Sequence, residues 1–172
     1  MAEFRPALFK VGLFAVIGRI INQNSVGILV NVRTDQEKQR KLAELPDDWE
    51  GVIVDLPGGT FQMGDDTFQT CLAREIREET GGCEPGFFAS ILGPFPMIKA
   101  DTGTADKPHD LAFVAACEIT GEPIPTPEAS EHRWVTWKQL QEETEFRLPG
   151  KLGKNGRMAK MIEAAMPLFA AQ

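Results

Sequence analysis

The sequence has few of the residues that build disulfide frameworks or zinc sites. It contains three cysteines and two histidines in 172 residues. Cys71, Cys83 and Cys117 are odd in number and form no Cys-x-x-Cys pair, so we expect reduced, largely buried thiols. Because the histidines are limited to His109 and His132, the sequence does not favour a zinc site.

Long apolar segments are also missing. The longest, residues 11–17, is shorter than the roughly 20 residues that a membrane-spanning helix needs. Residues 1–6 show no basic region followed by an apolar core and a cleavage site, so no secretory signal is recognisable. We therefore expect a soluble, cytoplasmic protein that does not act at a membrane.

Basic residues are outnumbered by acidic ones, 18 to 25, which gives a formal net charge of −7 at pH 7. Non-specific binding to nucleic acids or anionic membranes needs a basic surface that displaces counterions. The composition therefore disfavours such partners. An acidic protein can still act on anionic substrates if it first concentrates divalent cations.

The length and the 42% hydrophobic content fit a single domain over residues 1–172. Apolar and β-branched runs predict strands at residues 9–20, 26–32, 52–56, 87–98, 110–120 and 132–137. A helix is expected at 155–169, where apolar residues recur every three or four positions, and residues 33–51 are expected to form a loop with at most a short helical turn.

A central helix is predicted over residues 67–80. Asp66 and Thr67 are both good N-caps, Gln69 has the capping-box spacing from Asp66, and Gly81-Gly82 is a typical helix end. The order of strands and helices predicts an α/β (α+β) layered domain with this helix packed on a mixed sheet.

This central helix carries three closely spaced carboxylates. At about 100° per residue, Glu75, Glu78 and Glu79 project within an arc of roughly 100°. Leu72 and Ile76 border this arc, so the carboxylates are expected at the edge of a cleft. Two carboxylates about 5 Å apart repel by roughly 3 kcal/mol at an effective dielectric of 20, and a hard cation such as Mg²⁺ would compensate. Taken alone, however, the helix is explained better by a solvated face with Arg–Glu pairs.

The loop before the helix changes that balance. Together with Gly58-Gly59, the run Arg74-Glu75-Ile76-x-Glu78-Glu79-x-Gly81 resembles the Nudix box, G-x5-E-x7-R-E-U-x-E-E-x-G-U, where U is apolar. The motif covers about 24 residues and is far more specific than a glycine pattern. The strand before it and the Arg133-Trp134-Val135 segment after it are also similar to the family.

The box departs from the family pattern in its loop. Counting back from Arg74 places Asp66 at the position of the first Glu, with one residue inserted between Gly59 and Asp66. Gly82 replaces the last apolar residue, and Gln62 stands where many members carry a further Glu. These changes leave the Arg-Glu-x-x-Glu-Glu core intact, so metal binding is expected to be retained.

The resemblance implies a Nudix-type α/β/α sandwich and a bound Mg²⁺ or Mn²⁺. Glu75, Glu78 and Glu79 would hold the metal, the backbone of Gly59 would offer it a carbonyl, and Arg74 would orient the carboxylates. Water activated by the metal would then attack a diphosphate.

Residues outside the box would complete the site. The base that takes the proton from the water is Glu79, or one of Glu128 and Glu131 on the segment before Trp134, where a solvated carboxylate is an equally good interpretation. Candidate substrate-binding residues are Arg33, Lys99 and Phe61. The loop from Asp101 to Pro108, which Lys99 and His109 bracket, is a candidate lid over the site.

The resemblance thus implies hydrolysis of a nucleoside diphosphate derivative: a nucleoside triphosphate, a dinucleoside polyphosphate or an ADP-ribose-like sugar. Two alternatives stay open, an RNA 5′-pyrophosphohydrolase and a non-hydrolytic nucleotide sensor. The acidic composition argues against the first, and the intact carboxylates argue against the second. We expect a monomer or a homodimer.

Overall fold

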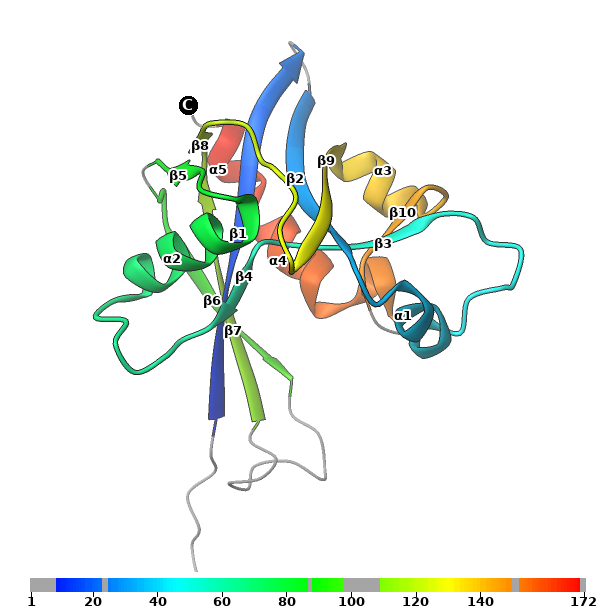
Figure 1. The fold of residues 1–172 in the computed structure, drawn as a ribbon, viewed down its shortest axis with the longest axis horizontal. Coiled ribbons are helices and arrows are strands. Elements are labelled where there is room, and N and C mark those ends of the chain that lie inside the picture. The colour runs from blue at the N-terminus through cyan, green and yellow to red at the C-terminus, as the bar shows by residue number, and fades with distance from the viewer. Residues whose placement is uncertain (1–8, 23–24, 87, 98–108, 150–151, 171–172) are drawn as a thin grey trace, which may run out of the picture.

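The computed structural model describes residues 9–22, 25–86, 88–97, 109–149 and 152–170 (Figure 1). In chain order the elements are β1 (Phe9–Asn22), β2 (Ser25–Arg33), α1 (Gln36–Ala43), β3 (Val52–Asp55), β4 (Gly58–Thr60), α2 (Phe68–Thr80), β5 (Glu84–Pro85), β6 (Ile91–Met97), β7 (His109–Cys117), β8 (Ile119–Thr120), β9 (Ala129–Thr136), α3 (Trp137–Glu142), β10 (Phe146–Arg147), a 3₁₀ turn (Gly153–Asn155), α4 (Arg157–Ala165) and α5 (Pro167–Ala170).

Eight of the strands form one mixed sheet in which the long strand β1 is central. The strand order is β10-β3-β2-β1-β7-β6, with β4 added beside β1 and β9 beside β2. From Phe9 to Ile17, β1 runs parallel to β7, and from Gly18 to Asn22 it pairs antiparallel with β2. β4 pairs with residues 12–14 of β1, on the same edge as β2 but before the residues that pair with β2. β1 therefore joins two halves of the sheet.

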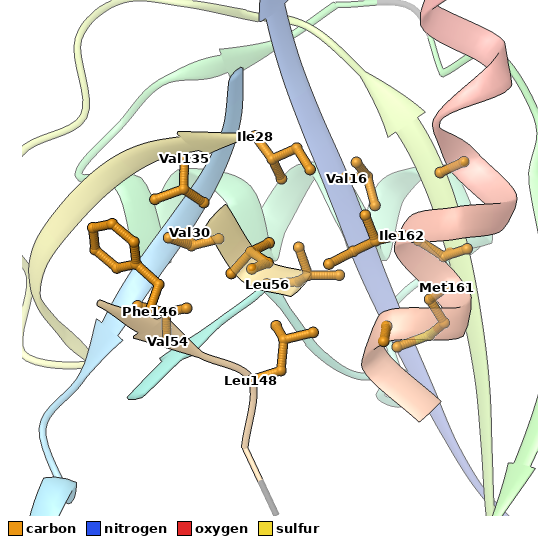
Figure 2. Packing of buried hydrophobic residues seen from close by; sticks show 14 of the residues in the cluster. Val16, Ile28, Val30, Val54, Leu56, Val135, Phe146, Leu148, Met161 and Ile162 are labelled. Atoms are coloured by element: carbon orange, nitrogen blue, oxygen red, sulfur yellow. The ribbon is translucent and has the colours of Figure 1, made fainter. Parts of the chain in front are cut away.

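The two faces of the sheet bury separate apolar cores. Alternate side chains of β1 point to opposite faces, so Leu13 and Ile17 pack with the α2 residues Leu72 and Ile76. On the other face, Val16 packs with residues of α4 (Figure 2). The sheet therefore lies between α2 and α4, which confirms the predicted layered α+β architecture with a central and a C-terminal helix.

Helix α2 is set by local signals at both ends. Thr67 is its N-cap: the Thr67 hydroxyl accepts from the Thr70 amide at 3.1 Å, and the Thr70 hydroxyl accepts from the Thr67 amide at 2.9 Å. The capping box therefore joins Thr67 to Thr70, and the predicted pairing of Asp66 with Gln69 was wrong. Gly81 ends the helix in the left-handed conformation, at φ 72°, as predicted.

Three predicted segments differ from the structure. The expected loop 33–51 contains the helix α1, whose hydrophobic signal is weak because its buried residues are Gln39 and Ala43. The expected helix 155–169 is split into α4 and α5 at Pro167, which has no amide proton to continue the first helix. The segment between residue 56 and the central helix, expected as a loop, begins with the short strand β4. The sequence did not predict α3 or β10.

Two predictions from composition can be compared with the structure. All three cysteines are buried and free of disulfides, as expected. Among the described residues, no helix is long and apolar enough to cross a membrane.

Replacing the N-cap should weaken the protein more than replacing its neighbour. We expect Thr67→Ala to lower the free energy of unfolding by about 1 kcal/mol, because the first turn of α2 loses a hydrogen-bond acceptor. Asp66→Ala, at the exposed preceding position, should change it by less than about 0.5 kcal/mol. Urea denaturation of both variants measures the difference, and equal losses would contradict the assignment of the cap.

Candidate active site

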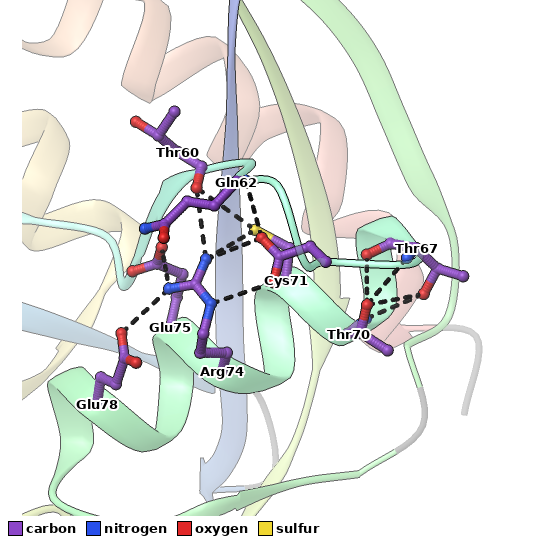
Figure 3. A network of polar contacts seen from close by, with 9 residues as sticks. Thr60, Gln62, Thr67, Thr70, Cys71, Arg74, Glu75 and Glu78 are labelled. Carbon is purple, nitrogen blue, oxygen red and sulfur yellow. Dashed lines mark hydrogen bonds and ion pairs between the residues drawn. The ribbon is translucent and has the colours of Figure 1, made fainter.

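Arg74 is the centre of a partly buried polar network between α2 and the loop before it (Figure 3). Its Nη1 donates to Glu75 Oε1 at 2.8 Å and to Glu78 Oε2 at 3.1 Å. Its Nη2 reaches the carbonyl oxygen of Thr60 at 3.4 Å. Arg74 therefore fixes the orientation of two of the three helix carboxylates and ties them to β4, and hydrogen bonds to Asp65 and then to Glu75 raise the pKa of its guanidinium.

A fourth carboxylate, Asp65, binds the same guanidinium. Asp65 accepts from Arg74 Nε at 3.1 Å and from Nη2 at 3.0 Å, which is a bidentate ion pair that holds the pKa of Asp65 well below its usual range. Asp66, which the residue count had placed at the first acidic position of the box, is exposed. Asp65 follows Gly59 after five residues, so the additional residue lies between Asp65 and Arg74.

Glu75 faces inward, against the backbone of β4. Its side chain is only 7% exposed, and burial raises its pKa despite the opposing ion pair with Arg74. A Cβ atom at position 59 would overlap the Glu75 carboxylate. Glycine at this position therefore brings the main chain of β4 directly beside the carboxylate, as a shared metal ligand set requires.

Glu79 is bound by other donors. Its Oε2 accepts from Asn31 Nδ2 and from the Gly58 amide, each at 2.9 Å. Burial raises the pKa of Glu79 to about 8, and the nearby charges of Asp55, Glu75 and Glu128 add to the effect, although the Gly58 hydrogen bond opposes it. The site thus holds more negative charge around Glu79 than its donors compensate.

Glu79 lines a cavity of about 440 Å³. The cavity is formed by residues of β1, β2, β3, β4 and α2 and by the segments that follow β2 and precede β9: Phe14, Asn31, Arg33, Thr34, Asp35, Asp55, Leu56, Gly58, Glu79 and Glu128. Four of these residues are acidic, so the cavity suits a ligand that arrives with a cation.

Arg33 brings positive charge to this cavity. It donates from Nη1 to Asp55 at 2.6 Å and from Nε to Asp35 at 2.7 Å. The pKa of Asp35 is lowered to about 2, chiefly by the Arg33 hydrogen bond. Burial raises the pKa of Asp55, although Arg33 opposes the shift. The sequence therefore identified a cavity residue in Arg33, but its guanidinium is shared between two carboxylates.

The proline-rich connection before β9 places Glu128 at the same cavity. Ile124 donates its amide to the carbonyl of Thr80 at 3.1 Å, and the Thr126 hydroxyl lies 3.4 Å from the carbonyl oxygen of Glu79. Thr126 also closes a tight turn onto Ala129, with hydrogen bonds of 2.9 and 3.1 Å. Glu128 is thus carried by a segment that is fastened to the C-terminal end of α2.

The other predicted residues are not brought to this cavity. Glu131 pairs with Arg133 at 2.7 Å and lies opposite Val32, whose side chain packs in the core on the α4 face of the sheet. Phe61 packs edge-on against Phe68 in the α2-side core. Lys99 and the candidate lid lie outside the described residues.

Sequence reasoning missed several polar residues that surround the carboxylates. Asn31 and Asp55 interrupt or end otherwise apolar strands, which was a visible signal. Asp65 differs from Asp66 only by its position in the loop, which a residue count cannot resolve. His132 is close to Asn31 because of strand pairing, and nothing in the sequence specifies that register.

The carboxylate and carbonyl oxygens beside α2 suit a hard cation, although the carboxylates do not converge on one point in the described structure. Arg74 takes one oxygen of Glu75 and one of Glu78, which leaves the second oxygen of each for a metal. Carboxylate and carbonyl oxygens are the ligands that Mg²⁺ and Mn²⁺ prefer. Within the described part of the chain, no three His, Cys, Asp or Glu residues are arranged to hold an ion as they stand.

The raised pKa of Glu79 predicts a pH-dependent loss of stability in metal-free protein. In the unfolded chain Glu79 loses its proton near its ordinary value of 4.5, whereas in the folded protein it keeps it up to about 8. Unfolding therefore releases a proton between these values, and stability falls as the pH rises through this window. Glu79→Gln should reduce that fall in chelator-treated protein, as measured by urea denaturation at pH 5 and pH 8. An equal fall in the variant would contradict the assignment.

Comparison with solved structures supports the fold. The chain is similar to a MutT protein from Methanosarcina mazei Go1, with 20% identity, 81% of this chain and 86% of that chain covered, and a TM-score of 0.52. It is also similar to the E. coli ORF135 protein, with 18% identity, 96% and 94% covered, and a TM-score of 0.54. An ADP-ribose pyrophosphatase from Streptococcus suis has 19% identity, 90% of each chain covered and a TM-score of 0.50. At these identities the likeness shows the fold alone.

One curated protein is more similar in sequence. The CMP-5′-(N-acetyl-N-hydroxy-3-aminopropyl)phosphonate hydrolase of Streptomyces rubellomurinus (strain ATCC 31215) is 32% identical over 102 residues, which are 59% of this chain. The match spans only 45% of that protein's length.

The family model named NUDIX domain matches residues 20–154, which is more than half of the chain and includes α2, the glycines before it and the segment that carries Glu128. This match confirms the resemblance found in the sequence: the chain belongs to the Nudix family.

Proposed function

We propose that the chain is a Mg²⁺- or Mn²⁺-dependent hydrolase that cleaves a diphosphate linkage in a nucleoside diphosphate derivative. The observation that carries the proposal is the shared environment of the α2 carboxylates. Glu75 and Glu78 share one arginine, and Glu79 keeps a pKa near 8 beside a cavity with three further acidic residues. Such uncompensated charge is costly in a structural role, and a divalent cation relieves it.

The metal ligands would come from two elements. Glu75, Glu78 and Glu79 would supply carboxylate oxygens from α2, and Gly59 would supply a main-chain oxygen from β4. Arg74 holds Glu75 and Glu78 by their other oxygens and so sets the direction of the free ones. When bound, the metal would supply charge neutralisation at the diphosphate and a water of lowered pKa.

The general base is one of two carboxylates that line the cavity. Glu79 lines the cavity and would be available as a base only in its ionised form, and a metal bound to it would reduce its basicity. Glu128 lines the same cavity from a fastened turn and is exposed to solvent. Glu131 loses support as a base because the structure places it on the other face of the sheet.

The substrate would enter the 440 Å³ cavity with its phosphates toward the metal. Arg33 is the basic residue that lines this cavity in the described part of the chain, and it would contact a phosphate or a ribose hydroxyl beside Asp35 and Asp55. The curated relative is named for a cytidine nucleotide joined to a phosphonate. A nucleotide joined through phosphorus to a second group is the corresponding substrate class for this chain.

The alternative functions have less support. Removing pyrophosphate from an RNA end would bring a long polyanion to a protein of net charge −7. A nucleotide sensor needs no hydrolytic carboxylates, whereas Glu75, Glu78 and Glu79 are all present beside the cavity. We also propose that the protein acts in the cytoplasm as a monomer or homodimer, on a small nucleotide.

Turnover of a substrate panel tests the proposal. We expect metal-dependent hydrolysis of at least one member of a panel of nucleoside di- and triphosphates, dinucleoside polyphosphates and nucleotide sugars, with Mg²⁺ or Mn²⁺. Glu78→Gln should lower kcat/KM by about 100-fold or more, because residues that merely orient metal ligands already contribute about 10–100-fold.

The matched control is Glu84→Gln. Glu84 forms an exposed ion pair with Arg77 at 2.7 Å, so the substitution makes the same change in charge outside the cavity. We expect it to leave kcat/KM within about twofold, since exposed pairs contribute little. A panel member that binds without being hydrolysed would instead favour the sensor.

A further inference from the structure

Asn31 is a buried polar residue in the middle of an apolar strand. It is 6% exposed, and its neighbours Val30 and Val32 belong to the core on the other face of the sheet. Its Nδ2 donates to Glu79 Oε2 at 2.9 Å, across 48 residues of sequence. Because a buried amide is costly unless it is hydrogen-bonded, its position beside Glu79 calls for a specific reason.

His132 holds the other end of this amide. It lies directly opposite Asn31 in the β2–β9 pair, so the two side chains are on the same face. Its Nδ1 is 2.9 Å from Asn31 Oδ1, and its Nε2 is 2.9 Å from the carbonyl oxygen of Ile124. Both ring nitrogens face oxygen acceptors, and a neutral imidazole donates to one of them; the tautomer with its proton on Nδ1 holds Oδ1 toward the ring and directs Nδ2 toward Glu79. With Glu79 ionised, as a metal ligand must be, the reversed amide would place two acceptors, Oδ1 and the carboxylate, against each other.

The result is a fixed orientation of the Glu79 carboxylate. Oε2 accepts from both Asn31 and the Gly58 amide, which come from two different strands. With Oε2 engaged twice, Oε1 is the oxygen that remains for a ligand in the cavity that Glu79 lines.

The anchor of His132 is itself fastened to α2. Ile124, whose carbonyl faces His132 Nε2, donates its amide to the carbonyl of Thr80, the residue after Glu79. The chain of contacts from Ile124 through His132 and Asn31 to Glu79 is therefore closed by the main chain of the helix. A side chain in such a closed ring has little freedom to turn.

We propose that His132 is a positioning residue for Glu79: acting through Asn31, it holds the carboxylate so that Oε1 is presented to the metal. This inference rests on the proposed function, because it assigns Glu79 its role in binding the cation. His132 touches neither the metal nor the substrate.

A double-mutant cycle of His132→Leu and Asn31→Leu tests the coupling, with Mn²⁺ binding followed by the loss of the free-ion electron paramagnetic resonance signal and with kcat/KM as a second readout. Each single variant should weaken Mn²⁺ binding or kcat/KM by about 10–100-fold, as removal of a group that orients a metal ligand does. Mn²⁺ binding and kcat/KM of the double variant should stay within about twofold of those of Asn31→Leu, because His132 acts through Asn31.

Two further variants separate positioning from folding. His132→Gln retains an amide donor for Asn31 and should recover at least part of the loss. Arg133→Gln, at the next and exposed position of β9, should bind Mn²⁺ and turn over substrate like the native chain. In metal-free protein, the side-chain amide signals of Asn31 in nuclear magnetic resonance spectra should shift when His132 is replaced by Gln, and this readout needs no activity.

Unchanged Mn²⁺ binding and turnover in His132→Leu, additive losses in the double variant, or unshifted Asn31 signals would each overturn the role of His132 while leaving the hydrolase proposal in place. A native chain that neither binds Mn²⁺ nor hydrolyses any nucleotide would overturn both.

Discussion

Repulsion among carboxylates around the C-terminal half of α2 is the constraint to which the neighbouring elements respond. Two carboxylates about 5 Å apart repel by about 3 kcal/mol at an effective dielectric of 20. Arg74 compensates part of this charge by binding Asp65, Glu75 and Glu78 together. In the described part of the chain Glu79 is held by neutral donors, and burial together with the neighbouring carboxylates raises its pKa to about 8. The four carboxylates are therefore not equivalent, and the least compensated one faces the cavity.

The fold supplies these compensating groups from segments that are distant in sequence. β4, which bears Gly58, pairs with residues 12–14 of β1, and β2, which bears Asn31, pairs with residues 18–22. Each of these two strands thus contributes a donor to Glu79 of α2. The pairing of β2 with β9 then adds His132. A one-residue slip of either register would turn Asn31 or His132 to the opposite face. The apolar cores on both faces fix that register, so their packing also determines the orientation of Glu79.

How much the sequence could predict depends on whether a residue is placed by the helix itself or by the loop and the strands around it. The carboxylates of α2 were predictable because helical spacing places them on one arc and glycines mark where the helix ends. The family resemblance and the layered fold followed from the same residues. Asp65 was not predictable, because a loop of irregular conformation decides which of two adjacent aspartates reaches Arg74. Asn31 and His132 were not recognised because their meeting depends on strand register, which is a property of the whole sheet. α1 escaped notice because it buries an amide and a methyl group rather than an apolar stripe.

The position of the acidic residues within α2 argues for function rather than stability. The C-terminal end of a helix carries partial negative charge from its unpaired carbonyls, so acidic side chains are least favourable in its last turn. Glu78 and Glu79 occupy that turn, with Arg77 directed away to Glu84. Ile124 and Thr126 cap the carbonyls of Thr80 and Glu79, which reduces the unfavourable field without supplying a charge. A helix selected for stability would place basic residues there. Native sequences break such a local rule mainly where the site needs the residue, and the proposed binding of a divalent cation would be such a need.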